Sequence, residues 1–212
     1  MSQCVIVGGG ECKNPARARE WIQPDDFIIA ADRGLLHLQA MGIEPNLLVG
    51  DFDSYPGRPP DKLKCVALPK EKDDTDMLYA ARLGLERGYR HFLLLGGMGG
   101  RLDHTMANLA VLCFLKRQGC HGILADQGCV AQMVCGEEIS LERTGEFRYL
   151  SVFAYDGAAS GVSLRGVKYP LDGGTLTGDY PIGCSNEIIE HSAYVGVGQG
   201  MALVMQCAES PW

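Results

Sequence analysis

The stretch HFLLLGGMGGRLDHTMANLAVLCFLKRQG, residues 91–119, contains the unit on which the fold prediction depends. It opens with a continuous apolar run, turns through a glycine-rich segment and continues as a helical pattern that ends at Gly119. The run predicts a strand that is buried on both faces, because a strand with one solvated face would alternate polar and apolar residues. The helical pattern predicts one buried face, made by Leu102, Met106, Leu109 and Cys113. A strand followed by a helix is the repeating unit of a parallel α/β sheet.

The same alternation extends toward the N-terminus. Apolar runs predict further strands at residues 4–10, 26–32, 46–52 and 65–69. Another helix is predicted over 75–88, where apolar residues recur at four-residue spacing and Gly88 can end the helix. Asp73, Asp74 and Thr75 can cap its first amide groups. Residues 1–125 are therefore predicted to form a largely parallel α/β domain.

The pattern changes after about residue 125. Short β-like segments now follow one another, joined by glycine-containing turns and without an amphipathic helix between them. This succession is typical of antiparallel sheets. Residues 126–212 are predicted to form a second, antiparallel β domain.

Composition narrows the classes of function. The net charge of −7 argues against a nonspecific nucleic-acid binder, because phosphate backbones are held mainly by clustered lysines and arginines. The nine cysteines include no C-x-x-C pair and are odd in number, so we expect mostly reduced thiols in a cytoplasmic protein. No apolar run approaches the roughly 18 residues that a membrane helix needs, and we expect no membrane association.

LVGDFDS, residues 48–54, places Asp51 and Asp53 at the end of a predicted buried strand. Residues two apart in an extended chain point the same way, so the two carboxylates could face one side. Two such charges repel unless a cation neutralises them, and Mg²⁺ prefers oxygen ligands, with water and phosphates completing its shell. The alternative is a simple turn, since Asp, Ser54, Pro56 and Gly57 are all turn formers.

Two other predicted strands also end in polar segments, at the edge of the sheet where α/β proteins bind ligands. In KEKDDTD (70–76), Asp73 and Asp74 suit helix capping, whereas Asp76 in the first helical turn is the better metal or nucleotide contact. GGMGGRLDH (96–104) can bring backbone amides to an anion, and Arg101 adds a fixed positive fork for phosphate. Neither this segment nor GGGECK (8–13) fits G-x-G-x-x-G, and the chain has no P-loop motif. His104 is either a structural or a catalytic residue.

Taken together, these segments resemble the thiamine pyrophosphokinase family. The matching stretches are ADRG (31–34), PNLLVGDFDS (45–54), KDDTD (72–76) and GGMGGRLDH (96–104), with GCSNEI (183–188) similar to the family's Ser-Asn segment. The resemblance implies an α/β catalytic domain followed by a β-sandwich domain, assembled as a homodimer with active sites between subunits. It also implies transfer of a pyrophosphoryl group from ATP to the hydroxyl of thiamine, which gives thiamine diphosphate and AMP.

The resemblance suggests a role for each matching residue. Asp51, Asp53 and Asp76 would hold Mg²⁺ against the triphosphate, with Asp32 nearby. Arg101 would brace phosphate oxygens and Thr75 could donate a hydrogen bond to one of them. Asp103 would contact the aminopyrimidine of thiamine, and Ser185 and Asn186 of the partner subunit would line the thiamine pocket.

One departure from the family pattern concerns thiamine stacking. Some relatives place a tryptophan shortly after the Ser-Asn segment, whereas Glu187, Ile188 and Ile189 follow it here. Two other functions would use the same groups: a Mg²⁺-dependent nucleotide phosphohydrolase that delivers water, and a noncatalytic thiamine or nucleotide sensor. A sensor would not need to retain the costly cluster of carboxylates.

Overall fold

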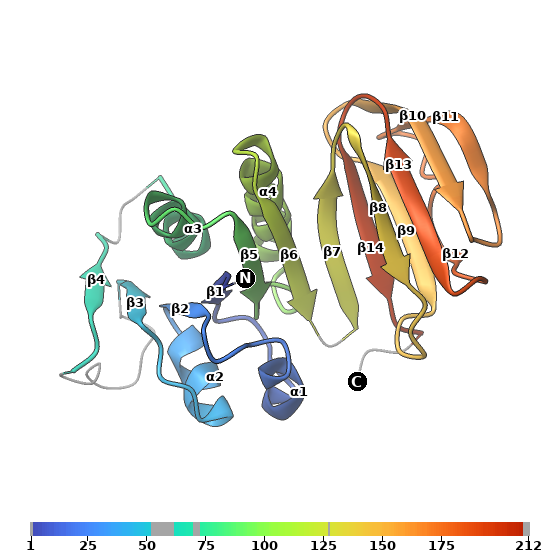
Figure 1. The fold of residues 1–212 in the computed structure, drawn as a ribbon. Helices are drawn as coiled ribbons and strands as arrows, with labels where there is room; N and C mark the ends of the chain where they lie inside the picture. The colour runs from blue at the N-terminus through green and yellow to red at the C-terminus, as the bar shows by residue number, and fades with distance from the viewer. Residues whose placement is uncertain (1, 52–61, 70–72, 127, 210–212) are drawn as a thin grey trace. The chain divides into compact units, whose positions relative to one another are not determined.

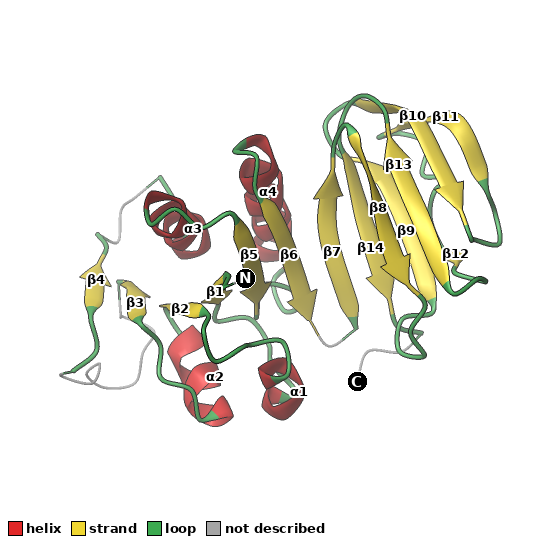
Figure 2. Ribbon diagram, in the orientation of Figure 1, coloured by secondary structure: helices red, strands yellow, loops and turns green. Residues whose placement is uncertain are grey.

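The computed structural model describes residues 2–51, 62–69, 73–126 and 128–209. The described chain divides into two compact units, the second of which begins at Gly128. Figure 1 follows the chain through its elements, and Figure 2 separates helices from strands.

The first unit is built on one parallel sheet. Its strands are β1 (Cys4–Val7), β2 (Phe27–Ala31), β3 (Leu47–Gly50), β4 (Cys65–Ala67), β5 (His91–Leu95) and β6 (His121–Asp126). They lie in the order β6-β5-β1-β2-β3-β4, and every pair of neighbours runs parallel. The side chains of β1 are buried throughout, as expected for a central strand with both faces covered.

Helices cover both faces of this sheet. They are α1 (Pro15–Arg19), α2 (Gly34–Met41), α3 (Asp76–Glu86) and α4 (Leu102–Arg117), with α1 and α2 on one face and α3 and α4 on the other (Figure 1). The predicted boundaries of α3 are confirmed at both ends. The Thr75 hydroxyl oxygen accepts a hydrogen bond from the Leu78 N–H at 3.2 Å, and Gly88 follows the helix with φ +88°.

The predicted buried face of α4 is partly wrong. Leu102 and Met106 are 74% and 53% exposed, although Leu109 and Cys113 are buried as expected. The buried face begins later and consists of Asn108, Leu109, Val111, Leu112, Cys113 and Leu115. The first turns of α4 border an open hollow, which His104 and Ala107 line, so apolar residues there gain no cover from a packed neighbour.

The second unit consists of two antiparallel sheets. One contains β12 (Asn186–Glu187), β9 (Tyr149–Ala154), β14 (Ala202–Cys207) and β7 (Cys129–Val134), in that order. The other contains β11 (Leu171–Thr177), β10 (Ala158–Arg165), β13 (Ser192–Val197) and β8 (Glu137–Glu142). Apolar residues from both sheets, such as Leu150, Val152, Val162 and Val195, form one core. The predicted class, a largely parallel α/β domain followed by an antiparallel β-sandwich, is confirmed.

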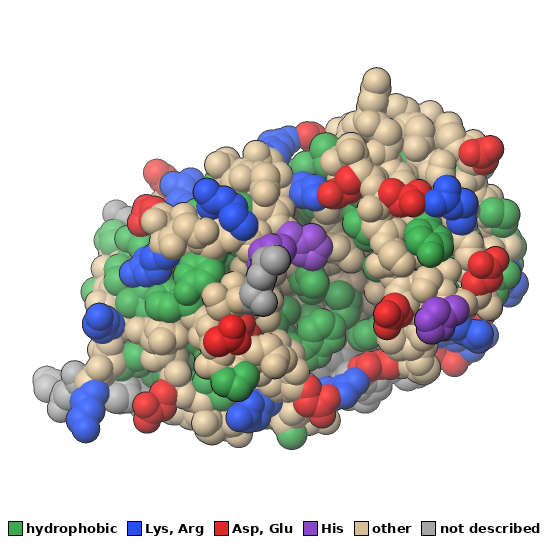
Figure 3. Space-filling model, viewed as in Figure 1, with side chains coloured by type: hydrophobic (Ala, Val, Ile, Leu, Met, Phe, Trp, Pro, Cys, Tyr) green, Lys and Arg blue, Asp and Glu red, His purple; other side chains and the backbone are tan. Residues whose placement is uncertain are grey.

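The helices and the surface charges show two further features. No helix in the described ranges combines the length and the apolar character needed to cross a bilayer. On the face shown in Figure 3, basic and acidic side chains are interspersed rather than gathered by sign.

Candidate active site

The strand order of the first unit reverses at β1. From β1 the chain proceeds outward through β2, β3 and β4, and then returns to add β5 and β6 on the other side of β1. At such a switch point the connections leave toward opposite faces of the sheet, which opens a crevice beyond the carboxyl ends of the strands. The structure has a hollow of about 580 Å³ here. Its walls come from the segments after β1, β2 and β5 and from the first turns of α3 and α4.

Two glycine loops form the floor of the hollow. The Gly10 N–H donates a hydrogen bond to the Gly96 carbonyl at 2.9 Å, and the Gly8 N–H donates to the Leu95 carbonyl at 2.8 Å. A Cβ atom on Gly10 would lie 2.5 Å from the Gly96 oxygen, and one on Gly96 would lie 2.5 Å from the Gly8 oxygen. The loops can approach this closely only as glycine, which leaves bare backbone facing the hollow. Bare backbone of this kind is what a phosphate group can approach.

A histidine that the sequence analysis missed anchors the first loop. His37 of α2 lies 2.6 Å from the Gly10 carbonyl through its Nε2 atom. Because a carbonyl oxygen can only accept, Nε2 must carry the proton and donate it. The second loop is held in a similar way, since the buried Asn108 side chain donates to the Gly97 carbonyl at 2.7 Å.

Four of the predicted site residues, Asp32, Thr75, Asp76 and Arg101, line this hollow together. Asp32 follows β2 and has φ +49°, a left-handed conformation that costs a non-glycine residue about 1 kcal/mol or more. Its N–H donates to the Val49 carbonyl at 2.7 Å, which helps hold this conformation. Asp76 is the first residue of α3, directly after the capping Thr75.

Asp51 is partly buried at the carboxyl end of a neighbouring strand. It follows β3, whose last residue Gly50 packs closely on Asp32, since a Cβ atom on Gly50 would lie 3.2 Å from the Asp32 Cα. Asp51 is not among the described residues that line the hollow, and Asp53 lies outside the described residues. Within the described ranges, no three His, Cys, Asp or Glu side chains are grouped closely enough to hold a metal ion. The metal set of Asp51, Asp53 and Asp76 therefore stays a prediction.

Arg101 and Asp103 bind each other at the rim. The Arg101 Nε and Nη2 atoms donate to the two Asp103 carboxylate oxygens at 3.1 and 2.5 Å, and both side chains are exposed. The hydrogen bond from Arg101 holds the pKa of Asp103 below its usual value. Arg101 and His104 line the hollow, so a phosphate placed there would compete with Asp103 for the guanidinium group.

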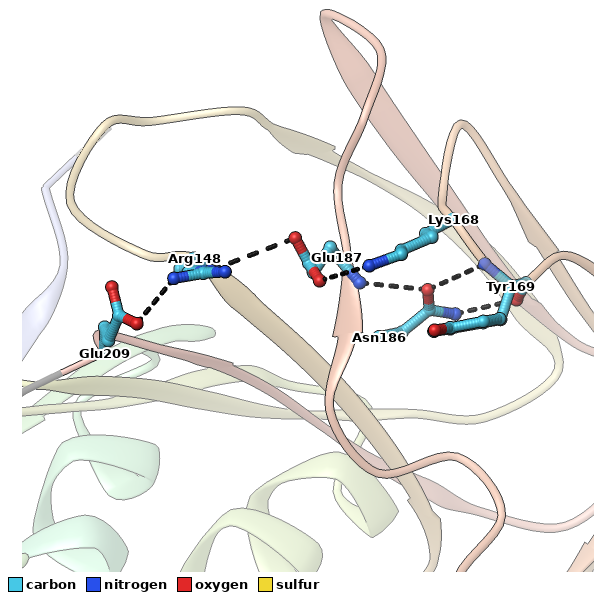
Figure 4. A network of polar contacts seen from close by, with 6 residues as sticks. All are labelled: Arg148, Lys168, Tyr169, Asn186, Glu187 and Glu209. Atoms are coloured by element: carbon cyan, nitrogen blue, oxygen red, sulfur yellow. Dashed lines mark hydrogen bonds and ion pairs between the residues drawn. The ribbon is translucent and has the colours of Figure 1, made fainter.

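In the second unit, Ser185 and Asn186 have different surroundings. Ser185 is exposed, has φ +59° and donates its N–H to the Ser151 hydroxyl at 3.0 Å. Asn186 is buried, and Figure 4 shows its side chain bound to the backbone of Tyr169. Its Oδ1 accepts from the N–H groups of Tyr169 and Glu187, and its Nδ2 donates to the Tyr169 carbonyl. Asn186 thus has at most one amide hydrogen left for a ligand.

The neighbouring Glu187 belongs to a chain of ion pairs. It accepts from Lys168 at 2.9 Å and lies 3.9 Å from Arg148, which also binds Glu209 (Figure 4). The hydrogen bond from Lys168 lowers the pKa of Glu187. These contacts fix the segment that carries Ser185 to the adjoining strands, while direct contact of Ser185 or Asn186 with thiamine stays a prediction.

Comparison with known proteins assigns the chain to a family. Residues 18–124 match the model for the thiamin pyrophosphokinase catalytic domain, and residues 137–202 match the model for its vitamin B1 binding domain. A thiamine pyrophosphokinase from Bacillus subtilis is 27% identical over 214 residues, which cover 99% of this chain and 100% of the relative. A solved thiamin pyrophosphokinase from Geobacillus thermodenitrificans has the same fold, with a TM-score of 0.86 at 27% identity over 98% of both chains. The solved Bacillus subtilis structure gives a TM-score of 0.88 at 24% identity and covers 99% of this chain and 100% of its own. The chain belongs to the thiamin pyrophosphokinase family.

Proposed function

We propose that the hollow of the first unit binds the triphosphate of ATP and that thiamine attacks the nucleotide there, giving thiamine diphosphate and AMP. Thiamine pyrophosphokinase activity itself follows from the two family domains and the full-length relatives. One observation carries the assignment to this hollow: two bare glycine loops, three carboxylates (Glu11, Asp32 and Asp76) and two arginines (Arg33 and Arg101) meet at the switch point of the sheet.

Phosphate binding would use the backbone first. The Gly8 and Gly10 N–H groups already bind the Leu95 and Gly96 carbonyls, so Gly9 and the Gly96–Gly100 loop would offer the main-chain amides. Both α3 and α4 begin at the hollow. The N-terminus of a helix carries a partial positive charge and amide groups without partners in the helix, so both helix starts favour an anion. Arg101 would exchange its bond to Asp103 for a phosphate oxygen, and Asp103 would then be available to thiamine.

The donors present fit a magnesium ion. Asp32 and Asp76 both line the hollow, and Mg²⁺ commonly takes one or two carboxylates together with phosphate oxygens and water. Asp51, Asp53 and Asp76 would hold it, with Asp32 nearby. When bound, Mg²⁺ would supply charge neutralisation on the phosphate oxygens.

The protein's own contribution to the reaction is positioning and charge. The hydroxyl oxygen of thiamine attacks the β-phosphorus of ATP, the bond from that phosphorus to the α-phosphate oxygen breaks, and AMP leaves. Arg101 would stabilise charge on the transferred group, and Thr75 could donate its hydroxyl hydrogen, because capping α3 uses the oxygen only as an acceptor. No general base is assigned, since a loose phosphoryl transition state needs little proton removal.

The thiamine-binding site would be completed by a second copy of the chain. We propose a homodimer in which Ser185 of one copy lines the thiamine pocket at the hollow of the other, with Asn186 shaping that segment through Tyr169. The exposure of Ser185 and of large apolar side chains in the same unit supports this arrangement; these are Tyr169, Tyr180, Ile182, Ile189 and Tyr194.

A product assay tests the function. The purified chain is incubated with ATP, Mg²⁺ and thiamine, and AMP, thiamine diphosphate and inorganic phosphate are quantified in parallel. Equal amounts of AMP and thiamine diphosphate, each dependent on thiamine, are expected. Phosphate release without thiamine would identify a hydrolase instead, and tight thiamine binding without any turnover would identify a sensor.

A further inference from the structure

Two cysteines face each other across neighbouring strands of the second unit. Cys129 of β7 and Cys207 of β14 are direct register partners, and their Sγ atoms are 3.2 Å apart. The next pair along the ladder is hydrogen-bonded, since the Ala208 N–H donates to the Gly128 carbonyl at 2.8 Å. Hydrogen-bonded and non-hydrogen-bonded pairs alternate in an antiparallel ladder, so Cys129 and Cys207 form a non-hydrogen-bonded pair.

The backbone of such a pair already has the spacing of a disulfide. The Cα atoms of non-hydrogen-bonded partners lie about 4.5 Å apart, and disulfides span Cα separations of about 4.4–6.8 Å. Both residues are only partly buried, which allows a small oxidant to reach them. A bond between the two sulfur atoms therefore requires side-chain rotation rather than movement of the strands.

The chemistry of the pair also favours reaction. A hydrogen bond from Cys129 lowers the pKa of Cys207 to about 7, although partial burial acts in the opposite direction. Burial alone raises the pKa of Cys65, and it is the main cause of the raised pKa of Cys120. Cys207 is thus a thiolate for much of the time at neutral pH, and the thiolate is the form that attacks a disulfide.

We propose that Cys129 and Cys207 are a redox-sensitive dithiol, which a small-molecule disulfide converts into an intrachain cross-link between β7 and β14. The Cys207 thiolate attacks one sulfur of the oxidant, which forms a mixed disulfide and releases one thiolate. Cys129 then loses its proton and attacks the Cys207 sulfur, which forms the internal bond and releases the second thiolate. In total, two protein thiols are oxidised and one small disulfide is reduced to two thiols.

The cross-link would stabilise the second unit. It joins residues 78 positions apart, so it closes nearly the whole unit into one covalent loop. Closing a long loop restricts the unfolded chain strongly, and for a unit of this size the expected rise in melting temperature is about 10 °C or more. This inference rests on the geometry of the second unit and not on the proposed function.

Peptide mapping of the full chain tests the proposal. The protein is equilibrated with glutathione disulfide at neutral pH, the remaining thiols are alkylated, and the protein is digested with trypsin. The expected product joins peptide 118–143, which carries Cys120, Cys129 and Cys135, to peptide 169–212, which carries Cys184 and Cys207. Because each peptide carries other cysteines, the link should persist in Cys120→Ser, Cys135→Ser and Cys184→Ser, and it should disappear in Cys129→Ser and in Cys207→Ser.

The melting temperature provides a second readout. The oxidised wild-type chain should unfold at the higher temperature, and dithiothreitol should restore the lower one. The proposal is overturned if no link between the two peptides forms, if the link persists in Cys207→Ser, or if oxidation leaves the melting temperature unchanged. If a variant fails to fold, fragmentation of the linked wild-type peptides decides instead, because it shows whether the bond joins Cys129 to Cys207 or another pair of cysteines.

Discussion

Replacing Gly96 by alanine tests whether close packing of the two glycine loops holds the site together. Gly96 has φ +60°, and a Cβ atom there would lie 2.5 Å from the Gly8 carbonyl oxygen. Gly100 is a matched control, because it has φ +64° and a Cβ atom there would have no neighbour within 4 Å. Both variants put alanine in a left-handed conformation, which costs about 1–2 kcal/mol. Only Gly96→Ala must also push the loops apart, and overpacking of this kind adds about 1–3 kcal/mol.

We therefore expect a free energy of unfolding lower by about 2–5 kcal/mol for Gly96→Ala and by about 1–2 kcal/mol for Gly100→Ala. Urea unfolding followed by the helical circular dichroism signal measures this, because all the helices in the described ranges belong to the first unit. The signal thus reports that unit even if the two units unfold separately. Equal losses in the two variants would refute the argument that loop contact is what requires glycine at position 96.

Four further predictions follow from the site and its surroundings. His37→Leu should raise the KM for ATP about threefold to tenfold with little change in kcat, because it releases the Gly10 carbonyl, and His37→Gln, which retains a donor, should restore part of the loss. Asp51→Asn and Asp76→Asn should each lower kcat/KM at least about a hundredfold without a large change in melting temperature; near-full activity at limiting Mg²⁺ would remove that residue from the metal set. Asp76→Asn and Ser185→Arg chains, mixed in equal amounts and allowed to re-pair at random, should recover about a quarter of wild-type activity if sites form between subunits. Half of the dimers are then mixed, and one of the two sites in each mixed dimer has both native residues. Sites within one subunit would recover no activity. Alkylation of Cys207 by iodoacetamide should accelerate as pH rises through about 7, since the thiolate is the reacting form, and a midpoint near that of an ordinary thiol would contradict the Cys129 hydrogen bond.

The fold class could be predicted because short stretches of sequence, namely apolar runs and helix-end residues, indicate each element. Continuous apolar runs indicated doubly covered strands, and Thr75 and Gly88 indicated both ends of α3. The meeting of Asp32 and Asp76 was also predictable, because the carboxyl ends of parallel strands share one edge of the sheet.

Other features depend on contacts between distant residues and left no local signal. No helix was predicted at α2, because it begins at Gly34 and glycine is normally a poor helix residue. Here a Cβ atom on Gly34 would lie 1.7 Å from the Val7 carbonyl oxygen. The Gly8–Gly10 loop was not predicted to line the hollow, because it fits no phosphate-binding motif and its place there depends on packing against Gly96. His37 was missed for the same reason, since its hydrogen bond to Gly10 spans 27 residues.

A structure of the chain with Mg²⁺ and a non-hydrolysable ATP analogue tests the central claim most directly. The account predicts the triphosphate in the hollow, against the backbone of Gly8–Gly10 and Gly96–Gly100, with Arg101 turned from Asp103 to a phosphate oxygen and the metal bound by Asp51, Asp53 and Asp76. A nucleotide bound elsewhere on the chain, or a triphosphate in the hollow with its metal held away from Asp76, would contradict it.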